Sequence, residues 1–332
     1  MRVMVVGGAG YIGSHAVRGL AQAGHDVRVF DNLSQGHRGS VPPSSLIIGD
    51  LADREALVRA LSDHRSEAVM HFAAFALVGE SVQDPAKYYK NNVVGSLNLL
   101  DAMRSVGVDR IVFSSTAAVY GVPETSPISE DFPKAPINPY GFTKLAIERV
   151  LADYAHAYGL GYAVLRYFNA CGAAQDAMIG EDHHPESHLI PLILQTALGQ
   201  RPNIRVFGTD YPTPDGTCIR DYIHVEDLAD AHEMALRRIE PGRGLTHNVG
   251  TGRGFSVLEV IEAARKITGR PIAVINDARR AGDPPALVAS SDAIQRDLGW
   301  SPKHREIESI VASAWKWHLS HPHGYNDRPA LN

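Results

Sequence analysis

Short apolar runs alternate with longer amphipathic stretches through the first half of the chain. The stretches predict helices at Ile12–Ala23, Arg54–Asp63, Pro85–Val106 and Pro139–Tyr158. The runs are rich in β-branched residues and predict buried strands at Val3–Val6, Val27–Phe30, Ala68–Phe72, Arg110–Phe113 and Tyr162–Tyr167. Such alternation is typical of βαβ units, so we expect an α/β fold with a parallel sheet and helices on both faces.

The pattern changes after Asn169, where Gly, Pro, His and Asp cluster in residues 180–185 and 208–216 and predict loops. We therefore expect the first domain to span residues 1–168 and a second to span 169–332. The boundary is not expected to be clean. Asp221–Arg238 and Leu245–Gly250 predict a helix and a strand that return to the first sheet.

Composition narrows the range of partners. The formal net charge of the 332 residues is -5 and is spread along the chain, which gives no reason to expect nucleic acid as a ligand. No apolar stretch approaches the ~20 residues that cross a membrane, so no membrane association is expected. Two cysteines, Cys171 and Cys218, make no disulfide framework and favour the reducing cytoplasm.

A glycine-rich turn follows the first predicted strand. Gly7, Gly10 and Gly13 form Gly-x-x-Gly-x-x-Gly, and a Gly-x-Gly-x-x-Gly begins at Gly8. Glycines permit the tight turn and let a pyrophosphate approach the backbone, and the N-terminus of the next helix supplies N–H donors. A turn that only permits close packing would carry the same glycines, but the strand–turn–helix context favours a dinucleotide site.

An acidic residue stands at the end of the second predicted strand, roughly 20 residues beyond the turn. This residue is Asp31, whose carboxylate is placed to accept hydrogen bonds from a ribose and to repel a 2′-phosphate. We therefore expect NAD rather than NADP. Asp50 and Leu51 follow another predicted strand end at Leu46–Gly49; they could meet the adenine or could be turn residues.

Tyr140 and Lys144 are four residues apart at the start of a predicted helix and should share one face. A nearby ammonium and a positively charged nicotinamide are expected to lower the phenol pKa, which would suit removal of a proton from an alcohol that loses hydride. A lone Tyr-x-x-x-Lys is common on helices. Here it accompanies a dinucleotide motif and a Ser/Thr-rich strand end, where Thr116 is the hydroxyl expected to bridge substrate and phenolate.

Together these segments resemble the extended short-chain dehydrogenase/reductase family, and within it the UDP-glucose 4-epimerase branch. The resemblance runs from Met1 to about Tyr325. It is carried by Gly7–His15, His71–Ala74, Val78–Ser81, Tyr88–Asn92, Phe113–Gly121, Tyr140–Lys144, Arg166–Asn169, Arg220–Val225 and Arg279–Asp283.

The resemblance implies a Rossmann domain with a smaller C-terminal domain, a tightly held NAD, a UDP-hexose substrate and a homodimer. It implies that Thr116 and Tyr140 meet the sugar. The residues implied to face NAD are Tyr11, Ile12, Asp31, Asn32, Asp50, Leu51, Phe72, Ala73, Asn91, Lys144 and Phe168. Those implied to hold the UDP-sugar are Asn169, His188, Leu189, Arg205, Phe207, Arg220, Arg280, Asp283 and Leu287.

The chain departs from the branch at three positions. Ala76 stands where some members carry a lysine near the cofactor, and His188 where some carry an asparagine near the diphosphate. Leu287 stands where a tyrosine often borders the sugar. The leucine leaves N-acetylated UDP-hexoses open as substrates.

Three other functions fit the sequence less well. A sugar-nucleotide dehydratase would need acids after the strand-end threonine, where this chain has Ala117 and Ala118. A non-catalytic NAD sensor could dispense with the Tyr/Lys pair. Zinc could bind His183, His184 and His188, but no metal is expected, because no cysteine or carboxylate set completes the sphere at familiar spacing.

Overall fold

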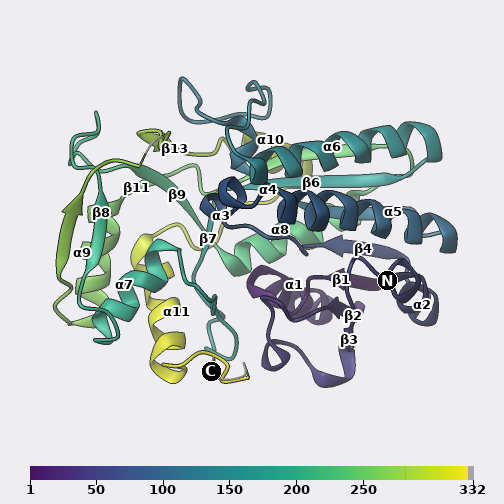
Figure 1. Cartoon of the computed structure of the whole chain (residues 1–332), viewed down its shortest axis with the longest axis horizontal. Helices are drawn as coiled ribbons and strands as arrows, with labels where there is room; N and C mark the ends of the chain where they lie inside the picture. The colour runs from purple at the N-terminus through teal and green to yellow at the C-terminus, as the bar shows by residue number, and fades with distance from the viewer. Residues whose placement is uncertain (281, 328–332) are drawn as a thin grey trace.

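A parallel sheet forms the larger part of the molecule. The computed structural model describes residues 1–280 and 282–327, and within these ranges the main sheet has seven strands (Figure 1). Every neighbouring pair is parallel, so the predicted α/β fold is confirmed. In spatial order the strands are β10 (Gly244–Val249), β6 (Gly161–Tyr167), β5 (Arg110–Thr116), β4 (Ala68–His71), β1 (Arg2–Val6), β2 (Asp26–Asp31) and β3 (Leu46–Ile48).

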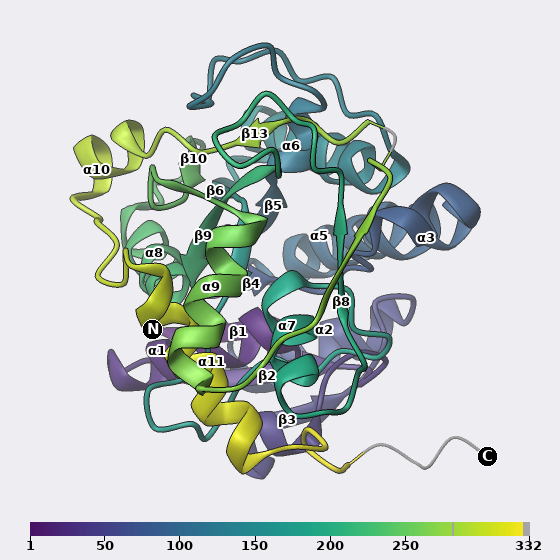
Figure 2. The same ribbon diagram turned by 90° about the vertical axis from the view of Figure 1, so that its left-hand side faces the viewer.

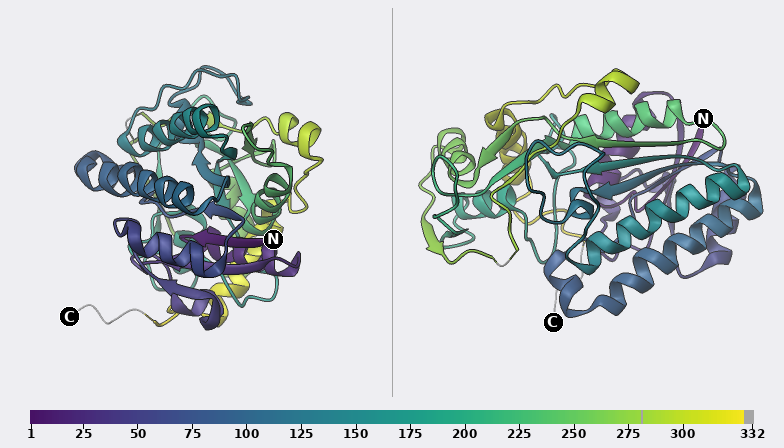
Figure 3. Two further views of the ribbon diagram at one scale, coloured as in Figure 1. Left: turned by 90° about the vertical axis from the view of Figure 1, so that its right-hand side faces the viewer. Right: turned by 90° about the horizontal axis from the view of Figure 1, so that it is seen from above.

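Helices cover both faces of this sheet because its strands are apolar on both sides. Val3 and Val5 of β1 pack with α1 (Tyr11–Gln22) and α8 (Val225–Arg238). Met4 and Val6 alternate with them and pack on the opposite face. That face is covered by α2 (Arg54–His64), α5 (Gly95–Val106) and α6 (Pro139–Tyr158); Figure 3 shows α5 and α6 on one side of the sheet and α8 on the other.

Two predicted helices are corrected by the structure. Pro85–Val106 is a short helix α4 (Pro85–Tyr88), a wide π-helical segment η3 (Tyr89–Val94) and then α5. Asp221–His224 belongs to strand β9 (Ile219–His224), and only Val225–Arg238 is helical. Strand β9 pairs with β7 (Asn169–Cys171), which is far away in the sequence, and this pairing makes Asp221–His224 a strand. A local hydrophobic pattern does not contain information on such long-range pairing.

Most of the remaining elements enclose a second, smaller core. Figure 2 shows how these elements are arranged. Besides β7, strand β9 pairs with β11 (Gly254–Ser256) and β13 (Ala286–Leu287). Strand β8 (Ile204–Phe207) pairs with β12 (Val274–Asp277). Helices α7 (Leu189–Ala197), α9 (Val257–Thr268) and α11 (Ile307–Ser320) enclose this core, while α3 (Val78–Gln83) and α10 (Asp292–Leu298) lie at the main sheet.

The chain leaves and re-enters the main sheet. After β6 it builds β7, α7, β8 and β9, and then α8 and β10 return, with β10 parallel to β6. Ala281 and residues 328–332, which belong to the predicted second domain, lie outside the described residues. Among those described, none of the helices is long and apolar enough to cross a membrane.

Candidate active site

A cleft opens at the carboxyl ends of β1, β2 and β4. β1 and β4 are neighbours in the sheet, and the strand order reverses between them, which is where open α/β sheets bind ligands. Eight residues predicted to face the cofactor line it: Gly7, Gly10, Asp31, Asn32, Leu51, Phe72, Ala73 and Asn91. Eight further lining residues were not predicted to face the cofactor: Val6, Phe30, Ser34, Gln35, Gly36, Gly49, Ala74 and Phe75.

The glycine turn is too crowded for any side chain at two positions. Gly7 has φ +78°, and a Cβ there would lie 2.4 Å from the Ala73 nitrogen. A Cβ on Gly13 would lie 2.2 Å from the Gly7 oxygen. Helix α1 begins at Tyr11, after the N-cap residue Gly10, with no side-chain cap and no acid in its first turn. Its N-terminal dipole is therefore free of a competing anion, as a bound pyrophosphate requires.

Asp31 lies at the edge of the cleft. Its carboxylate accepts hydrogen bonds from the Ala9 nitrogen at 2.9 Å and the Leu33 nitrogen at 2.8 Å. Burial raises the pKa of Asp31, and the two backbone donors oppose that shift. Each carboxylate oxygen has further acceptor capacity. The residue thus holds the glycine turn and can still accept from a ribose, which fits NAD.

Other residues predicted to face the cofactor are not among those that line the cleft: Tyr11, Ile12, Gly13, Asp50, Lys144 and Phe168. The Tyr11 hydroxyl donates to the Gly172 oxygen at 2.7 Å. Asp50 accepts from the Asn32 amide at 2.6 Å, and Phe168 packs beside buried Val119 and Tyr120.

Tyr140, Lys144 and Thr116 meet at the carboxyl end of β5, the strand next to β4. Asn138 caps α6 through its side chain, which accepts from the Gly141 nitrogen at 2.8 Å, and this start places Tyr140 in the first turn. Tyr140 is hydrogen-bonded to Thr116, the last residue of β5. The Lys144 ammonium is buried and donates to the Ser114 oxygen at 2.8 Å.

Burial dominates the electrostatics of this pair. It lowers the pKa of Lys144 to about 7, against the attraction of Glu148. It raises the pKa of Tyr140, and the hydrogen bond with Thr116 opposes the shift only in part. In the chain by itself desolvation disfavours both charged forms, and the lowering of the phenol pKa by the ammonium and a bound nicotinamide stays a prediction.

A buried ion pair between α6 and β6 was not predicted from the sequence. Glu148 lies one turn after Lys144 and accepts from the Arg166 Nε at 3.0 Å, and both side chains are less than a tenth exposed. Glu148 also accepts from Ser115, and Arg166 donates to the Tyr120 hydroxyl at 2.9 Å. The pair thus joins α6 to β5 and β6. The signal in the sequence that could have predicted this pair is Arg166, an arginine inside the apolar strand β6.

The residues predicted to hold the UDP-sugar lie mostly around β8, β9 and the segment before β13. Arg220 pairs with Asp283 at 2.8 Å, and the Arg280 guanidinium lies 4.0 Å from the centre of the Phe207 ring. Leu287 lies opposite Arg220 in the strand register. The structure therefore brings these five residues together in two adjoining groups.

Three more of these residues lie on neighbouring elements. Asn169 donates to the Asp221 oxygen at 3.0 Å, and exposed Arg205 pairs with Asp277 at 3.0 Å. Leu189 is the first residue of α7.

His188 differs from the others in its partner, because its ring is hydrogen-bonded to buried Glu181 in the loop before α7. No sequence argument foresaw that contact.

Residues 3–250 match the NAD dependent epimerase/dehydratase family. The chain belongs to that family. The predictions of family, fold and NAD dependence are therefore confirmed. Relatives include the UDP-glucose 4-epimerase of Halalkalibacterium halodurans, 52% identical over 98% of both chains. That of Lacticaseibacillus casei is 50% identical over 99% of this chain and 100% of its own.

Solved structures of the family superpose closely on the chain. The crystal structure of UDP-glucose 4-epimerase from Brucella ovis in complex with NAD has a TM-score of 0.92 and 49% identity. The match covers 95% of this chain and 97% of that one. The likeness therefore extends over both cores and not only over the main sheet.

Proposed function

We propose that the chain is a UDP-glucose 4-epimerase that interconverts UDP-galactose and UDP-glucose in galactose metabolism. The observation that carries the proposal is that Tyr140, Lys144 and Thr116 lie at the carboxyl end of β5, the strand next to β4, and that residues just after β4 line the cleft. Residues 1–168, with the later segments near 221–250 that return to the main sheet, form the NAD-binding part, and residues 169–332 otherwise hold the UDP moiety.

Bound NAD supplies a site that accepts hydride from C4 and returns it. Tyr140 removes the proton from the C4 hydroxyl and later returns it. Thr116, which is hydrogen-bonded to Tyr140, bridges the phenolate and the C4 oxygen. Lys144 supplies positive charge behind the phenol. Arg220 and Arg280 hold the diphosphate, because guanidinium groups pair with phosphates in bidentate fashion. Because only the UDP moiety is held firmly, the 4-keto hexose is free to rotate and to present its other face for the return of the hydride.

Purified protein incubated with UDP-galactose, without added NAD, tests this proposal. The expected product is UDP-glucose, and the absence of any interconversion would refute the assignment. A 4-keto-6-deoxy product would instead identify a dehydratase. We do not expect it, because Ala117 and Ala118 follow Thr116 and have no group that could donate a proton.

Cofactor released by denaturing the purified protein is expected to be NAD, because the Asp31 carboxylate would repel a 2′-phosphate. Asp31→Ser should reduce the preference for NAD over NADP by at least ~10-fold, the effect of about 1.4 kcal/mol. Asp26→Ser, at the opposite and exposed end of the same strand, is the matched control. Recovery of mainly NADP from the wild type would contradict the expectation.

Leu287 is expected to leave room for an N-acetyl group on the hexose. Part of its side chain packs beside buried Val119, Tyr120 and Ile128. Leu287→Tyr should reduce kcat/KM for UDP-N-acetylgalactosamine relative to UDP-galactose by roughly 10–200-fold, the range for a misfit in a pocket. An unchanged ratio would show that Leu287 is only a packing residue.

The chain is proposed to act as a homodimer in the cytoplasm, where buried Cys171 and Cys218 would remain free thiols. The dimer is supported by large exposed apolar side chains on α3, η3 and α6, elements that pack together. They are Val78, Val82, Tyr89, Val94 and Phe142.

Val82→Glu is expected to raise the dimer dissociation constant at least ~10-fold, because burying an unpaired carboxylate costs more than about 1.4 kcal/mol. Sedimentation equilibrium measures this. Leu319→Glu, at an exposed position of α11, is the control. Equal dissociation constants for the two variants would exclude this face.

A further inference from the structure

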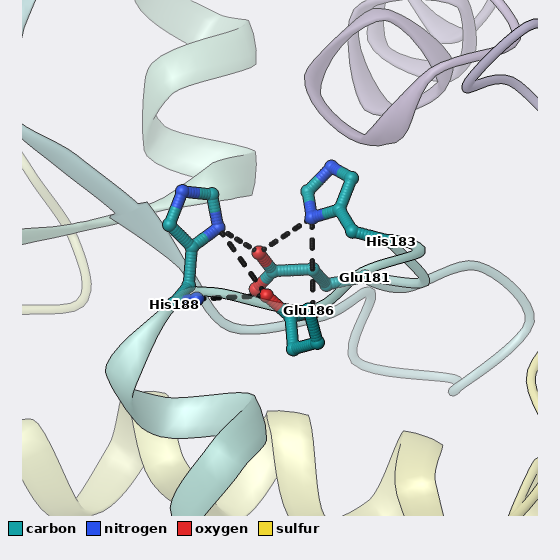
Figure 4. Close-up of side chains that lie close together, drawn as sticks. All are labelled: Glu181, His183, Glu186 and His188. Carbon is teal, nitrogen blue, oxygen red and sulfur yellow. Dashed lines mark hydrogen bonds and ion pairs between the residues drawn. The ribbon is translucent and has the colours of Figure 1, made fainter. Parts of the chain in front are cut away.

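The loop between β7 and α7 gathers four side chains that can each bind a metal ion. They are Glu181, His183, Glu186 and His188, and one ligand atom from each lies within 4.8 Å of the others. Figure 4 shows the Nδ1 atoms of both imidazoles directed at the carboxylates. The two carboxylates come from the same short loop as the two histidines, and the sequence alone did not predict this grouping.

The separations suit a small tetrahedral ion. The His183 Nδ1 lies 3.2 Å from a Glu181 oxygen and 3.7 Å from a Glu186 oxygen. The His188 Nδ1 lies 3.9 Å from Glu186 and is hydrogen-bonded to Glu181. Ligands at about 2.0–2.1 Å from zinc are roughly 3.3 Å apart in a tetrahedron. Small side-chain adjustments would therefore bring all four atoms into coordination.

Burial and charge point the same way. The side chains of Glu181 and Glu186 are only 4% and 6% exposed, and buried carboxylates require a cationic partner, which in the chain by itself is the pair of imidazoles they contact. Two carboxylates would offset the charge of a divalent ion, and two neutral imidazoles would complete its coordination sphere. His188 is 55% exposed and leaves the ion a path from solvent. We propose that Glu181, His183, Glu186 and His188 form a binding site for a divalent transition-metal ion such as zinc.

The ion would act on structure rather than on chemistry, because four protein ligands close the coordination sphere. The His183 ring meets the Tyr11 ring edge-on at 6.0 Å, at the start of α1. The Trp317 indole of α11 donates to the Glu181 backbone oxygen at 3.2 Å. A metal here would stabilise the loop where it contacts both helices. His188 is also one of the residues implied to hold the UDP-sugar, but zinc binding can be measured without epimerase activity.

Zinc titration of the full chain tests the site, after treatment with a chelator that is then removed. We expect one zinc per chain by equilibrium dialysis with elemental analysis, and a Tm that rises with free zinc. Cobalt should give the visible absorption of a four-coordinate complex. Loss of an outer-sphere partner costs 10–100-fold in affinity, so His183→Gln and Glu186→Gln should each weaken zinc binding at least ~100-fold.

Two histidine controls separate this site from others. His184→Gln alters an exposed neighbour in the same loop that lies outside the cluster. His304→Gln alters a second group, His224, Glu226 and His304. Both controls should keep wild-type zinc affinity. The proposal is overturned if the wild type binds no saturable zinc, which would leave a closed ion-pair network. It is also overturned if the folded variants His183→Gln and Glu186→Gln, checked by circular dichroism, bind as tightly as the wild type.

Discussion

Tyr140→Phe is expected to reduce the epimerase turnover number by at least ~100-fold, the usual contribution of a positioned proton-transfer group. The substitution removes only the hydroxyl that is hydrogen-bonded to Thr116 and leaves the ring to fill its place. NAD content should stay at the wild-type level. The measurement is interconversion of UDP-galactose and UDP-glucose under saturating substrate.

Tyr158→Phe is the matched control for this experiment. Tyr158 is the last residue of the same helix and is 54% exposed, so its hydroxyl should not affect turnover. A near-normal rate for Tyr140→Phe would remove this residue from the mechanism. A loss confined to KM would instead place it in substrate binding.

Arg166→Met is expected to lower the free energy of unfolding by about 3–5 kcal/mol, the cost of leaving one member of a buried ion pair uncompensated. The Glu148 carboxylate would lose its charged partner in a site where its side chain is 8% exposed. The double variant Glu148→Leu/Arg166→Met removes both charges and should be more stable than Arg166→Met alone. Urea unfolding measures all three proteins.

An exposed pair on the same helix provides the comparison. Arg149 and Asp153 are 79% and 60% exposed, and Arg149→Met should cost at most about 1 kcal/mol. If Arg166→Met costs no more than Arg149→Met, the buried pair does not stabilise the fold. If the double variant is less stable than Arg166→Met, the pair's hydrogen bonds to Ser115 and Tyr120 matter more than its charges.

Local pattern was sufficient for the elements whose hydrophobic period is regular, buried strands and amphipathic helices alike. β1, α1, β2 and α6 lie within one or two residues of their predicted bounds, because the hydrophobic period changes sharply where each one ends. The pattern failed at η3, where a wide turn interrupts a helix. There the Asn92 side chain bonds the Phe75 backbone and Thr143, contacts that no local period records.

By itself the sequence determined the parallel α/β fold, the glycine turn with Asp31, and the pairing of Tyr140 with Lys144, because spacing along one strand or helix fixes each of these. Tertiary structure alone decided what packs against them. It buried Lys144 enough to lower its pKa to about 7 and joined Glu148 to Arg166 across two elements. It also turned a histidine-rich loop into a four-ligand cluster, since desolvation and contacts between separate segments depend on distances that sequence spacing does not contain.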